Sequence, residues 1–434
     1  MSEAKNVNGQ QPESGKWRAQ KSIKQLRTSI SVSAHQKEWF QNMRERISQG
    51  EPFAICNAGE CEEIFTVMDI PVVVKQWWSA MIAAKQMSSH YFNLLDEKGY
   101  DQCRYCALGL GCTMDHNPER APWGGLPKPA VIIGGNIPGA ECDAHQRINE
   151  LWAREYGTSL FPLEVTFPTR LYPRWWERIK DHWDEIIEPH RLDLRVDELK
   201  ELIRFLEVTT GKIFSMAKLR EVMELINEQN EYFKKARNLI AETVPCPVSL
   251  SEQVSVYRAQ WHRGTQVGID LTKMFYEEVK ERVDNGEAAC PDEKIRLMWS
   301  GVGLWHNTAF YQYFEEKYGA VFVCSEYLAV AADGYQRNFL NDPLRALASR
   351  CVFLGLRGGD WRVKEAKLNK VNGVVQLVKR GCRESIEAPL IRMALENAGI
   401  PVLPIYADNV DPRDWDDTKM KSLVSDFIEA RLLS

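Results

Sequence analysis

Residues 374–382 read VVQLVKRGC, a mostly apolar run, Val374–Val378, followed at once by Lys-Arg-Gly and a cysteine. A short apolar run between turn residues is typical of a strand buried on both faces of a parallel sheet. Helical patterns, among them Glu387–Ala398 and Met420–Leu432, alternate with such runs, which predicts a parallel α/β domain over residues 246–434. The other runs in this half are Ile295–Trp299, Val321–Val323, Val352–Leu356 and Pro401–Tyr406.

The first half of the chain repeats this alternation. A helical segment begins near Ser33, and we expect it to lead into a first α/β domain, together spanning residues 33–194. Pro162 places its run near a sheet edge, because proline cannot donate a ladder hydrogen bond. The runs predicted as strands are Pro52–Cys56, Ile70–Val74, Ala130–Ile133 and Leu160–Val165.

Between the two halves, residues 195–245 have apolar side chains at helical spacing on either side of Gly211, which predicts a helical hairpin. Residues 1–32 are predicted to form a mobile N-terminal tail. The expected fold is therefore α/β: two Rossmann- or flavodoxin-like parallel-sheet domains around a cleft, with the helical segment before them and the hairpin between them. Ligands collect at the carboxyl ends of parallel strands, so chemistry is expected in the loops that follow them.

Composition excludes several classes of protein. The 434 residues carry 55 basic and 60 acidic side chains, a net charge of −5, which lacks the basic excess of a nucleic-acid binder. No stretch approaches eighteen uncharged apolar residues, so no membrane span is expected. Residues 1–16 lack the apolar core of a signal peptide, which predicts a cytoplasmic protein.

Standard nucleotide motifs are also missing from the sequence. Gly211-Lys212 lacks both the upstream glycine and the following Ser or Thr of a P-loop, and Gly301-Val302-Gly303 lacks the third glycine of a dinucleotide fingerprint. Neither HExxH nor GxSxG occurs. We therefore expect no ATP or NAD site in this chain, and any energy input is expected to come from another subunit.

Eleven cysteines are many for a compartment that keeps thiols reduced, and some are candidate metal ligands. Cys103, Cys106 and Cys112 form C-x2-C-x5-C on a predicted loop, and this spacing fits neither a ferredoxin run nor a paired zinc site. Cys142 and Cys382 each follow a predicted strand in a different α/β half. They could therefore face one another across the cleft.

The other cysteines have simpler interpretations. Cys56, Cys324 and Cys351 lie in or at the ends of apolar runs, where a free cysteine usually acts as a small buried filler. Cys246 and Cys290 lie beside prolines in linkers. The residue pattern leaves the roles of Cys61 and Cys112 open.

Four segments resemble the catalytic subunits of the benzoyl-CoA reductase and 2-hydroxyacyl-CoA dehydratase family. Together they cover roughly residues 50–432 in the same order as the family's blocks, and the aromatic-rich third segment most resembles the larger catalytic subunit of an ATP-dependent benzoyl-CoA reductase. The segments are RYCALGLG around Cys106, NIPGAECD around Cys142, WSGVGLWHNTAFYQYFEEKYGAVFVCSEY at 299–327, and VVQLVKRGCRESIEAPLIRMALENAGIPVLPIYADNVDPRDW at 374–415.

The resemblance implies a [4Fe–4S] cluster held between the two domains by one cysteine from each block. These are Cys106, Cys142 and Cys382, with Cys103 and Cys112 as alternates for the first. Three protein ligands would leave one iron with an exchangeable position.

The resemblance also implies partners and a reaction. The partners would be a smaller homologous catalytic subunit, ATP-dependent iron–sulfur activator subunits and ferredoxin as the upstream donor. The expected reaction is the dearomatising two-electron reduction of benzoyl-CoA, an aromatic acyl-CoA, in one-electron steps during anaerobic aromatic catabolism. One alternative is a lyase, a (R)-2-hydroxyacyl-CoA dehydratase subunit that recycles its electron. Another is a non-catalytic electron-relay subunit whose cluster takes a fourth ligand from Cys103 or Cys112, and a zinc-binding structural protein is a distant third.

A ring reduction needs a proton donor. His145 and His306 are the candidates, although each is more simply a surface or supporting histidine. Arg380 could place positive charge near the cluster or pair with Asp408 or Asp411. These two aspartates and Arg413 also match a family motif, which we interpret as a structural turn held by charge pairs. The tryptophan pairs Trp77–Trp78 and Trp175–Trp176 suit an acyl pocket, although core packing explains them more simply.

Overall fold

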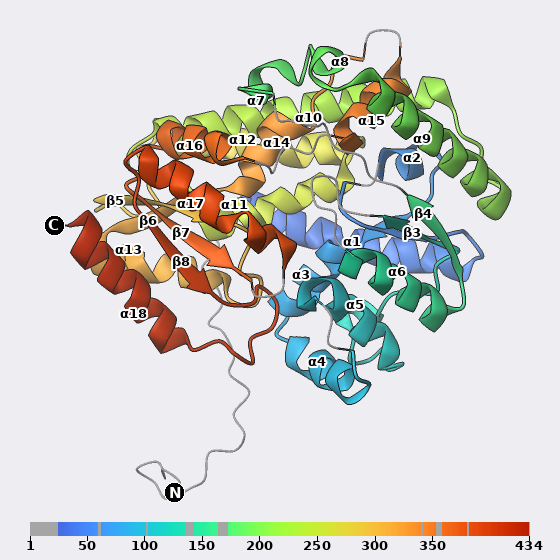
Figure 1. Cartoon of the computed structure of the whole chain (residues 1–434), viewed down its shortest axis with the longest axis horizontal. Coiled ribbons are helices and arrows are strands. Elements are labelled where there is room, and N and C mark those ends of the chain that lie inside the picture. The colour runs from blue at the N-terminus through green and yellow to red at the C-terminus, as the bar shows by residue number, and fades with distance from the viewer. Residues whose placement is uncertain are drawn as a thin grey trace, which may run out of the picture.

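A computed structural model describes residues 25–59, 62–100, 103–135, 143–163, 172–339, 342–352, 358–379 and 382–433; the side chains of residues 135, 143, 145, 351, 352, 383 and 384 are not described. Within these residues, the fold is α/β with two parallel four-stranded sheets, as predicted. Figure 1 shows the first sheet on the right and the second on the left, with helices around both.

The first sheet has the strand order β2-β1-β3-β4, and all its pairings are parallel. Ala54 lies opposite both Val72 and Val131, which makes β1 and β3 the central strands. Pro162 lies in the edge strand β4, which confirms its predicted place. The strands are β1 (Ala54–Cys56), β2 (Val72–Val74), β3 (Val131–Gly135) and β4 (Ser159–Leu163).

The second sheet has the corresponding order β6-β5-β7-β8 and is also parallel throughout. All six residues of β5 and of β6 are buried, as expected for strands covered on both faces. The predicted strand at Val352–Leu356 is wrong at its first residue, because Val352 ends a helix; residues 353–357 lie outside the described part. The strands are β5 (Ile295–Ser300), β6 (Ala320–Ser325), β7 (Gly373–Val378) and β8 (Val402–Tyr406).

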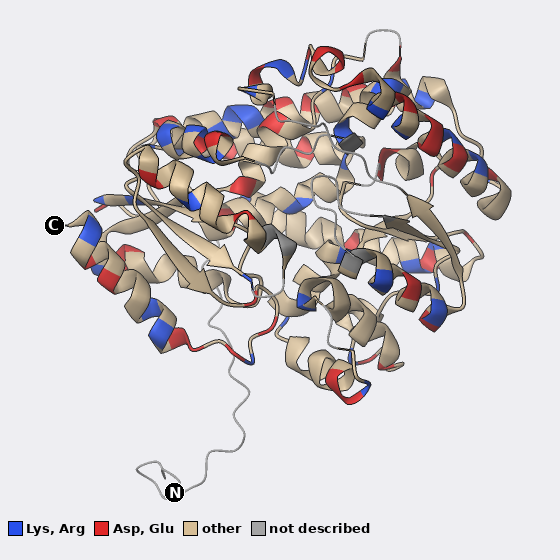
Figure 2. Ribbon diagram, in the orientation of Figure 1, with Lys and Arg blue, Asp and Glu red and all other residues tan. Residues whose placement is uncertain are grey.

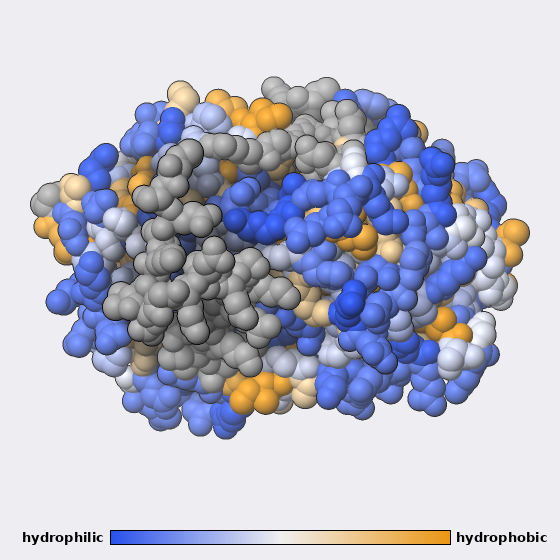
Figure 3. Space-filling view, turned by 90° about the horizontal axis from the view of Figure 1, so that it is seen from below, coloured by the Kyte–Doolittle hydropathy of each residue, from blue (hydrophilic) through white to orange (hydrophobic). Residues whose placement is uncertain are grey.

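Helices cover both sheets, and Figure 2 shows their charged residues as a mixture of both signs on the outer surfaces. The face seen in Figure 3 is largely hydrophilic with small apolar patches. No described helix is both long and apolar enough to cross a bilayer. The helices up to β5 are α1 (Arg27–Ser48), α2 (Glu62–Val67), α3 (Lys75–Ala84), α4 (Ser88–Glu97), α5 (Arg104–Met114), η1 (Pro122–Gly124), α6 (Asp143–Tyr156), α7 (Trp175–Arg178), α8 (Trp183–Ile186), α9 (Pro189–Thr210), α10 (Met216–Glu242), α11 (Leu250–Tyr257), η2 (Arg258–His262) and α12 (Gln266–Asp284).

The helices after β5 complete the second half. Figure 1 places α13 and α18 below the second sheet and α16 and α17 above it. These helices are η3 (Thr308–Gln312), α13 (Tyr313–Tyr318), α14 (Glu326–Gly334), α15 (Pro343–Val352), α16 (Gly359–Leu368), η4 (Arg383–Ile386), α17 (Ala388–Asn397), α18 (Asp417–Phe427) and η5 (Ile428–Leu432).

Two predictions about helices need correction. The N-terminal helix begins at Arg27 rather than near Ser33, because Glu252 accepts the backbone N–H of Leu26 and Glu278 accepts that of Thr28, so residues 27–32 are not a mobile tail. The predicted hairpin has its two helices, α9 and α10, but most of the contacts of each are with other elements. Helix α9 packs on α15 and β4, while α10 packs against α12, α14 and α2. The predicted domain boundaries stay a prediction.

One apolar core runs through both halves. It includes Ile55 and Ile132 of the first sheet together with Trp299 and Val375 of the second. The helix α10 strengthens this union, because it packs against α2 in the first half and α14 in the second. The two sheets are therefore held as one unit with their carboxyl ends on a common cavity, described next.

Candidate functional site

A cavity of about 240 Å³ lies where strands of both sheets end. Ala58 follows β1, Gly301 follows β5 and Lys379 follows β7, and all three line it. The positive φ of Gly301, +102°, lets the chain turn there, and a Cβ at this position would lie 3.1 Å from the carbonyl oxygen of Leu377. The predicted cleft at the carboxyl ends of parallel strands is therefore present.

Aromatic side chains form much of the cavity wall. The rings of Trp77 and Trp261 lie 4.3 Å apart, and Tyr327 lies 5.0 Å from Tyr257 and 5.4 Å from Trp305. These are tilted and edge-on contacts, the arrangements that aromatic rings prefer. The wall suits a bulky apolar or aromatic group, because such a group can bury its surface against several rings.

Two buried ion pairs brace the charged part of the wall. The guanidinium of Arg362 donates to both carboxylate oxygens of Glu326, at 2.7 and 3.2 Å. Glu326 also accepts hydrogen bonds from Ser300 Oγ at 2.9 Å and from the Gly301 N–H at 3.2 Å, so one carboxylate fixes the exit of β5. Arg263 pairs with Glu62 at 2.9 Å, and each of these arginines thus has its charge neutralised.

Three thiols meet beside this cavity. Cys103 lies within hydrogen-bonding reach of both Cys106 and Cys382, which come from different α/β halves. The hydrogen bond with Cys106, together with burial, raises the pKa of Cys103 to about 12, although the hydrogen bond with Cys382 and the charge of Lys379 act in the opposite direction. The ammonium of Lys379 lies 5.1 Å from the ring of Tyr105, and both side chains line the cavity.

The first cysteine block forms a helix rather than the predicted loop. Cys103 is the residue just before α5, and the helix itself carries Cys106 and Cys112. Cys112 lies six positions after Cys106, so the two point to different sides of the helix. Cys112 interacts with the hydroxyl of Tyr91 instead of the other thiols, and burial raises its pKa to about 12. Cys112 is therefore a poor alternate ligand, and Cys103 is the nearer one.

The donor set suits a soft metal or an iron–sulfur group, because it consists of thiols beside a lysine that could offset their negative charge. In the described residues, no group of three or more His, Cys, Asp or Glu side chains has metal-ligating geometry. Cys142, the second predicted ligand, lies outside the described part of the chain, as do Cys61 and Arg380. The assignment of Cys106, Cys142 and Cys382 to one cluster stays a prediction.

The other described cysteines are buried in other parts of the fold. Cys56 lies in β1 and Cys324 in β6, as fillers of apolar strands. Cys246 donates its S–H to the Val248 carbonyl at 3.3 Å and Cys290 to the Glu315 carbonyl at 3.6 Å. The eight cysteines described form no disulfide with one another, and the side chain of Cys351 is not described.

Of the two histidine candidates, His306 does not line the cavity, and the side chain of His145 is not described. His306 is buried against Trp415, with ring centroids 5.3 Å apart, and its Nε2 lies 3.2 Å from the Asp408 carbonyl oxygen. Burial lowers its pKa to about 4, so the imidazole is neutral near pH 7, and it does not line the cavity. The side chain of His145, in α6, is not described.

The Asp–Arg motif after β8 is the structural turn that we expected. Asp408 Oδ1 accepts the backbone N–H groups of Val410 and Asp411, at 2.8 and 2.9 Å. Arg413 then pairs with Asp411 at 2.7 Å. Arg413 also reaches α4, where Asp96 lies 2.5 Å away. The turn therefore joins the two halves.

The tryptophan pairs serve both roles. Trp78 is fully buried against Phe40 and Trp175 packs on Trp361, as core residues, whereas Trp77 lines the cavity. The sequence analysis missed other wall residues. Trp305 and Tyr327 follow β5 and β6, so the strand-exit rule could have found them, but no sequence signal marked the wall residues of α11 and η2, Tyr257 and Trp261.

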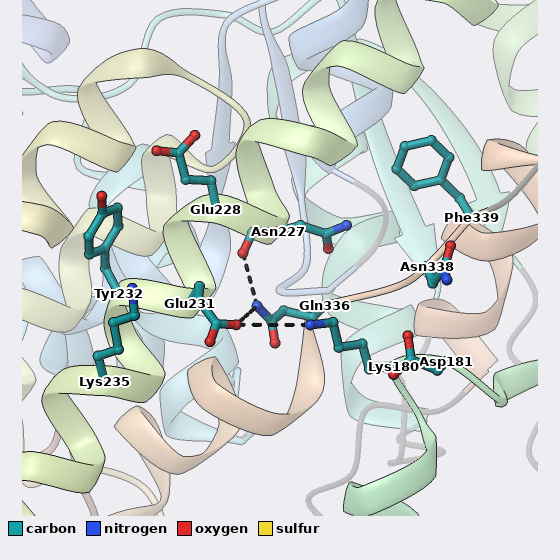
Figure 4. Close-up of a pocket in the computed structure, with 10 residues that line it drawn as sticks. All are labelled: Lys180, Asp181, Asn227, Glu228, Glu231, Tyr232, Lys235, Gln336, Asn338 and Phe339. Atoms are coloured by element: carbon teal, nitrogen blue, oxygen red, sulfur yellow. Dashed lines mark hydrogen bonds and ion pairs between the residues drawn. The ribbon is translucent and has the colours of Figure 1, made fainter.

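A second, larger hollow of about 500 Å³ lies between α10 and the segments after α7 and α14. Figure 4 shows that its polar side chains bond to one another: Gln336 donates to the Asn227 carbonyl at 2.9 Å and to Glu231 at 2.8 Å, while Lys180 approaches Glu231 at 4.0 Å. These side chains bond to one another and link neighbouring segments, so they have a structural role. We therefore take the cavity at the strand ends, rather than this hollow, as the candidate functional site.

The fold and the site define a class: a two-domain α/β protein with a cavity and clustered thiols at the carboxyl ends of its strands. The family model for 2-hydroxyglutaryl-CoA dehydratase, D-component, matches residues 59–430, and the chain belongs to this family.

Three proteins share sequence similarity over much of the chain. The (R)-2-hydroxyisocaproyl-CoA dehydratase alpha subunit of Clostridioides difficile is 24% identical over 90% of this chain and 93% of its own length. The (R)-phenyllactyl-CoA dehydratase alpha subunit of Clostridium sporogenes is 22% identical over 87% and 90%. The (R)-2-hydroxyglutaryl-CoA dehydratase subunit alpha of Acidaminococcus fermentans is 22% identical over 69% and 60%. These relatives are dehydratases, so the predicted benzoyl-CoA reductase identity is not confirmed and the dehydratase alternative fits better.

Proposed function

We propose that this chain is a catalytic subunit of a (R)-2-hydroxyacyl-CoA dehydratase. The observation that carries the proposal is the cavity beside Cys103, Cys106 and Cys382, at the strand ends of a chain that belongs to a dehydratase family. The net reaction breaks the C2–OH bond and a C3–H bond, forms a C2=C3 double bond and releases water. It consumes no electrons overall, which makes the enzyme a lyase.

The residues assigned to a [4Fe–4S] cluster are Cys106, Cys142 and Cys382, with Cys103 as the alternate. When bound, such a cluster would supply a one-electron carrier with an iron open to a substrate oxygen. The chain's own part is to hold the thiols together from both halves and to place the charge of Lys379 beside them. Cys106 is buried and Cys103 is partly buried, which limits the access of water to this group.

The acyl group is proposed to lie against the aromatic wall. Trp77, Trp261, Trp305 and Tyr327 can bury a branched or aromatic acyl chain and keep it dry. The fixed ion pair of Glu326 and Arg362 keeps the strand exits in place around it. Such positioning supports catalysis because it holds the reacting bonds in one orientation.

The aromatic wall also suits benzoyl-CoA, so the dearomatising reductase remains the second candidate. The two reactions differ in their electron count. A reductase consumes two electrons for each ring that it reduces, whereas a dehydratase returns its electron at the end of each turnover. A non-catalytic relay subunit is the third candidate, and it would bind no acyl thioester.

The proposal includes partners, because the relatives are alpha subunits. We propose a homologous second subunit and an ATP-dependent iron–sulfur activator fed by ferredoxin, since this sequence has no P-loop of its own.

The test is anaerobic co-expression with the second subunit and addition of activator, ATP and a low-potential reductant. The dehydratase proposal predicts that (R)-phenyllactyl-CoA or (R)-2-hydroxyisocaproyl-CoA is converted to its enoyl-CoA over many turnovers per electron supplied. Loss of benzoyl-CoA with two electrons per product would instead support the reductase. Iron and sulfide assays on the same protein test for about four of each per chain.

A further inference from the structure

Three arginines line the cavity, and they differ in how their charge is balanced. Arg263 pairs with Glu62 and with Glu63, at 2.9 and 3.4 Å, and Arg362 pairs with Glu326 at 2.7 Å. Arg258 has no carboxylate partner among the described residues. Within the described part of the chain, it is the one of the three whose positive charge has no counter-charge.

Neutral oxygens hold the guanidinium of Arg258 in place. Its Nε donates to the Ser255 carbonyl at 2.7 Å, and its Nη1 donates to Gln36 Oε1 at 2.9 Å. Its Nη2 donates to Ser33 Oγ at 2.7 Å and to Ser255 Oγ at 2.8 Å. A guanidinium has five N–H donors, so these four bonds leave one Nη1 N–H for another acceptor.

This arrangement is fixed before any ligand arrives. Ser33 and Gln36 lie on α1, whose start is held to α11 and α12 through Glu252 and Glu278. Burial lowers the pKa of Arg258 to about 10, so the guanidinium still carries its charge at neutral pH. A fixed charge with little water around it attracts an anion more strongly than one in bulk water.

We propose that Arg258 binds an anionic oxygen of the acyl part of the substrate in this cavity. This inference rests on the proposed dehydratase function. The oxygen has two possible sources with the same chemistry: a carboxylate at the far end of the acyl chain, or the thioester oxygen as it gains negative charge during the reaction. Both would accept the remaining Nη1 N–H of Arg258 as a charge-assisted hydrogen bond.

The test compares the wild-type complex with R258Q and R258K. Calorimetry measures binding, and the turnover assay of the proposed function measures kcat. The probes are (R)-2-hydroxyglutaryl-CoA, which carries an acyl carboxylate, (R)-2-hydroxyisocaproyl-CoA, which does not, and free CoA. Arg204→Gln is the matched control, because Arg204 is exposed on α9 and, in the described part of the chain, pairs with Glu201 on the same helix alone. Circular dichroism of each variant checks that it folds.

A carboxylate source predicts that R258Q weakens binding of the glutaryl thioester about tenfold or more and leaves the isocaproyl thioester unchanged. A thioester-oxygen source predicts that kcat falls about tenfold or more for both substrates with little change in binding. R258K keeps the charge and is expected to lose less in either case. A double variant, Ser33→Ala with Gln36→Leu, keeps the guanidinium but loosens it, and should show the same pattern at two- to threefold if R258Q does not fold.

Equal binding and equal kcat for R258Q and the wild type would overturn the inference, as would a matching tenfold loss for free CoA, which would place a CoA phosphate on Arg258. If the wild type turns over a hydroxyacyl thioester and R258Q does so equally, the role of Arg258 alone fails. If the wild-type complex binds no acyl thioester, the proposed function and this inference both fail.

Discussion

Asp96 Oδ2 and Arg413 Nη1 lie 2.5 Å apart and join α4 of the first half to the turn after β8 of the second. The same aspartate pairs with Arg104 at 2.8 Å, and Arg104 follows Cys103 directly. Asp411 completes the group, 2.7 Å from Arg413 and 3.7 Å from Arg104. The charges that hold the two halves together therefore also position the helix that carries the thiols.

Asp96→Asn should lower the free energy of unfolding at neutral pH relative to the wild type, and this deficit should shrink in acid. Although burial raises the pKa of Asp96, hydrogen bonds from Arg413 and Arg104 outweigh it and hold this pKa below its ordinary value. Its contribution is therefore present above about pH 4 and is lost as pH falls through the lowered folded value. We expect a deficit of about 1 kcal/mol in the free energy of unfolding at pH 7, measured by urea denaturation. A deficit that stays the same size as the pH is lowered through the acid range would contradict the assignment.

Gly109→Ala tests the packing of the helix that carries Cys106. A Cβ at Gly109 would lie 2.6 Å from the ring of Trp152, so α5 would have to shift. At an open helical position the same change stabilises by up to about 1 kcal/mol, whereas here we expect a loss of about 1 to 3 kcal/mol. The sign of the change in a thermal-unfolding experiment decides between the two. In a Trp152→Leu background, which is destabilised on its own account, Gly109→Ala should cost less than it does in the wild type.

Glu326→Gln should strongly destabilise the second half. The change leaves the guanidinium of Arg362 buried without its counter-charge, and removal of one partner from such a pair costs about 3 to 5 kcal/mol. Replacing both residues by apolar ones, Glu326→Leu with Arg362→Met, should cost much less. Denaturant unfolding of Glu326→Leu, Arg362→Met and the double variant that combines them measures the coupling. Additive losses would show that the pair does not act as a unit.

The strands could be predicted because each is a short apolar run between turns, a pattern that burial on both faces requires. The prediction of a strand at Val352 was wrong, because α15 continues through a residue that is equally apolar in either structure. The apolar stripes of α9 and α10 were predicted correctly, but a stripe does not show which neighbouring element buries it. Tertiary contacts with α15 and α12 settled that choice.

The site could be predicted in part for a similar reason. The cavity and Cys382 follow from the rule that loops after parallel strands carry function. The rule could not choose between Cys103 and Cys112, because that depends on where α5 begins and on which side each thiol emerges. Nor could it find Trp261 or Arg258, since η2 follows a helix rather than a strand.

Cysteine substitutions test the proposed cluster site. We expect Cys106→Ser and Cys382→Ser to lose most of the bound iron in anaerobically prepared protein, because each removes a thiolate ligand. Cys103→Ser should keep the iron but alter the EPR spectrum, since Cys103 contacts both other thiols. Cys112→Ser is the matched control on the same helix and should leave iron and spectrum unchanged. Iron loss in Cys103→Ser but not in Cys106→Ser would mean that Cys103, rather than Cys106, is the ligand. If neither of these two variants lost iron, the proposed site would be contradicted.

Trp261→Leu tests whether the aromatic wall selects the acyl group. The ring of Trp261 lies 4.3 Å from that of Trp77, and both line the cavity, so its loss removes part of the surface against which a phenyl ring would pack. Aromatic contacts of this kind contribute about 0.5 to 1.5 kcal/mol beyond burial. The ratio of kcat/KM for phenyllactyl-CoA over 2-hydroxyisocaproyl-CoA should therefore fall about three- to tenfold. Trp176→Leu, at a tryptophan outside the cavity lining, serves as the control. An unchanged ratio in Trp261→Leu, with both substrates still turned over, would mean that the acyl group lies elsewhere in the cavity.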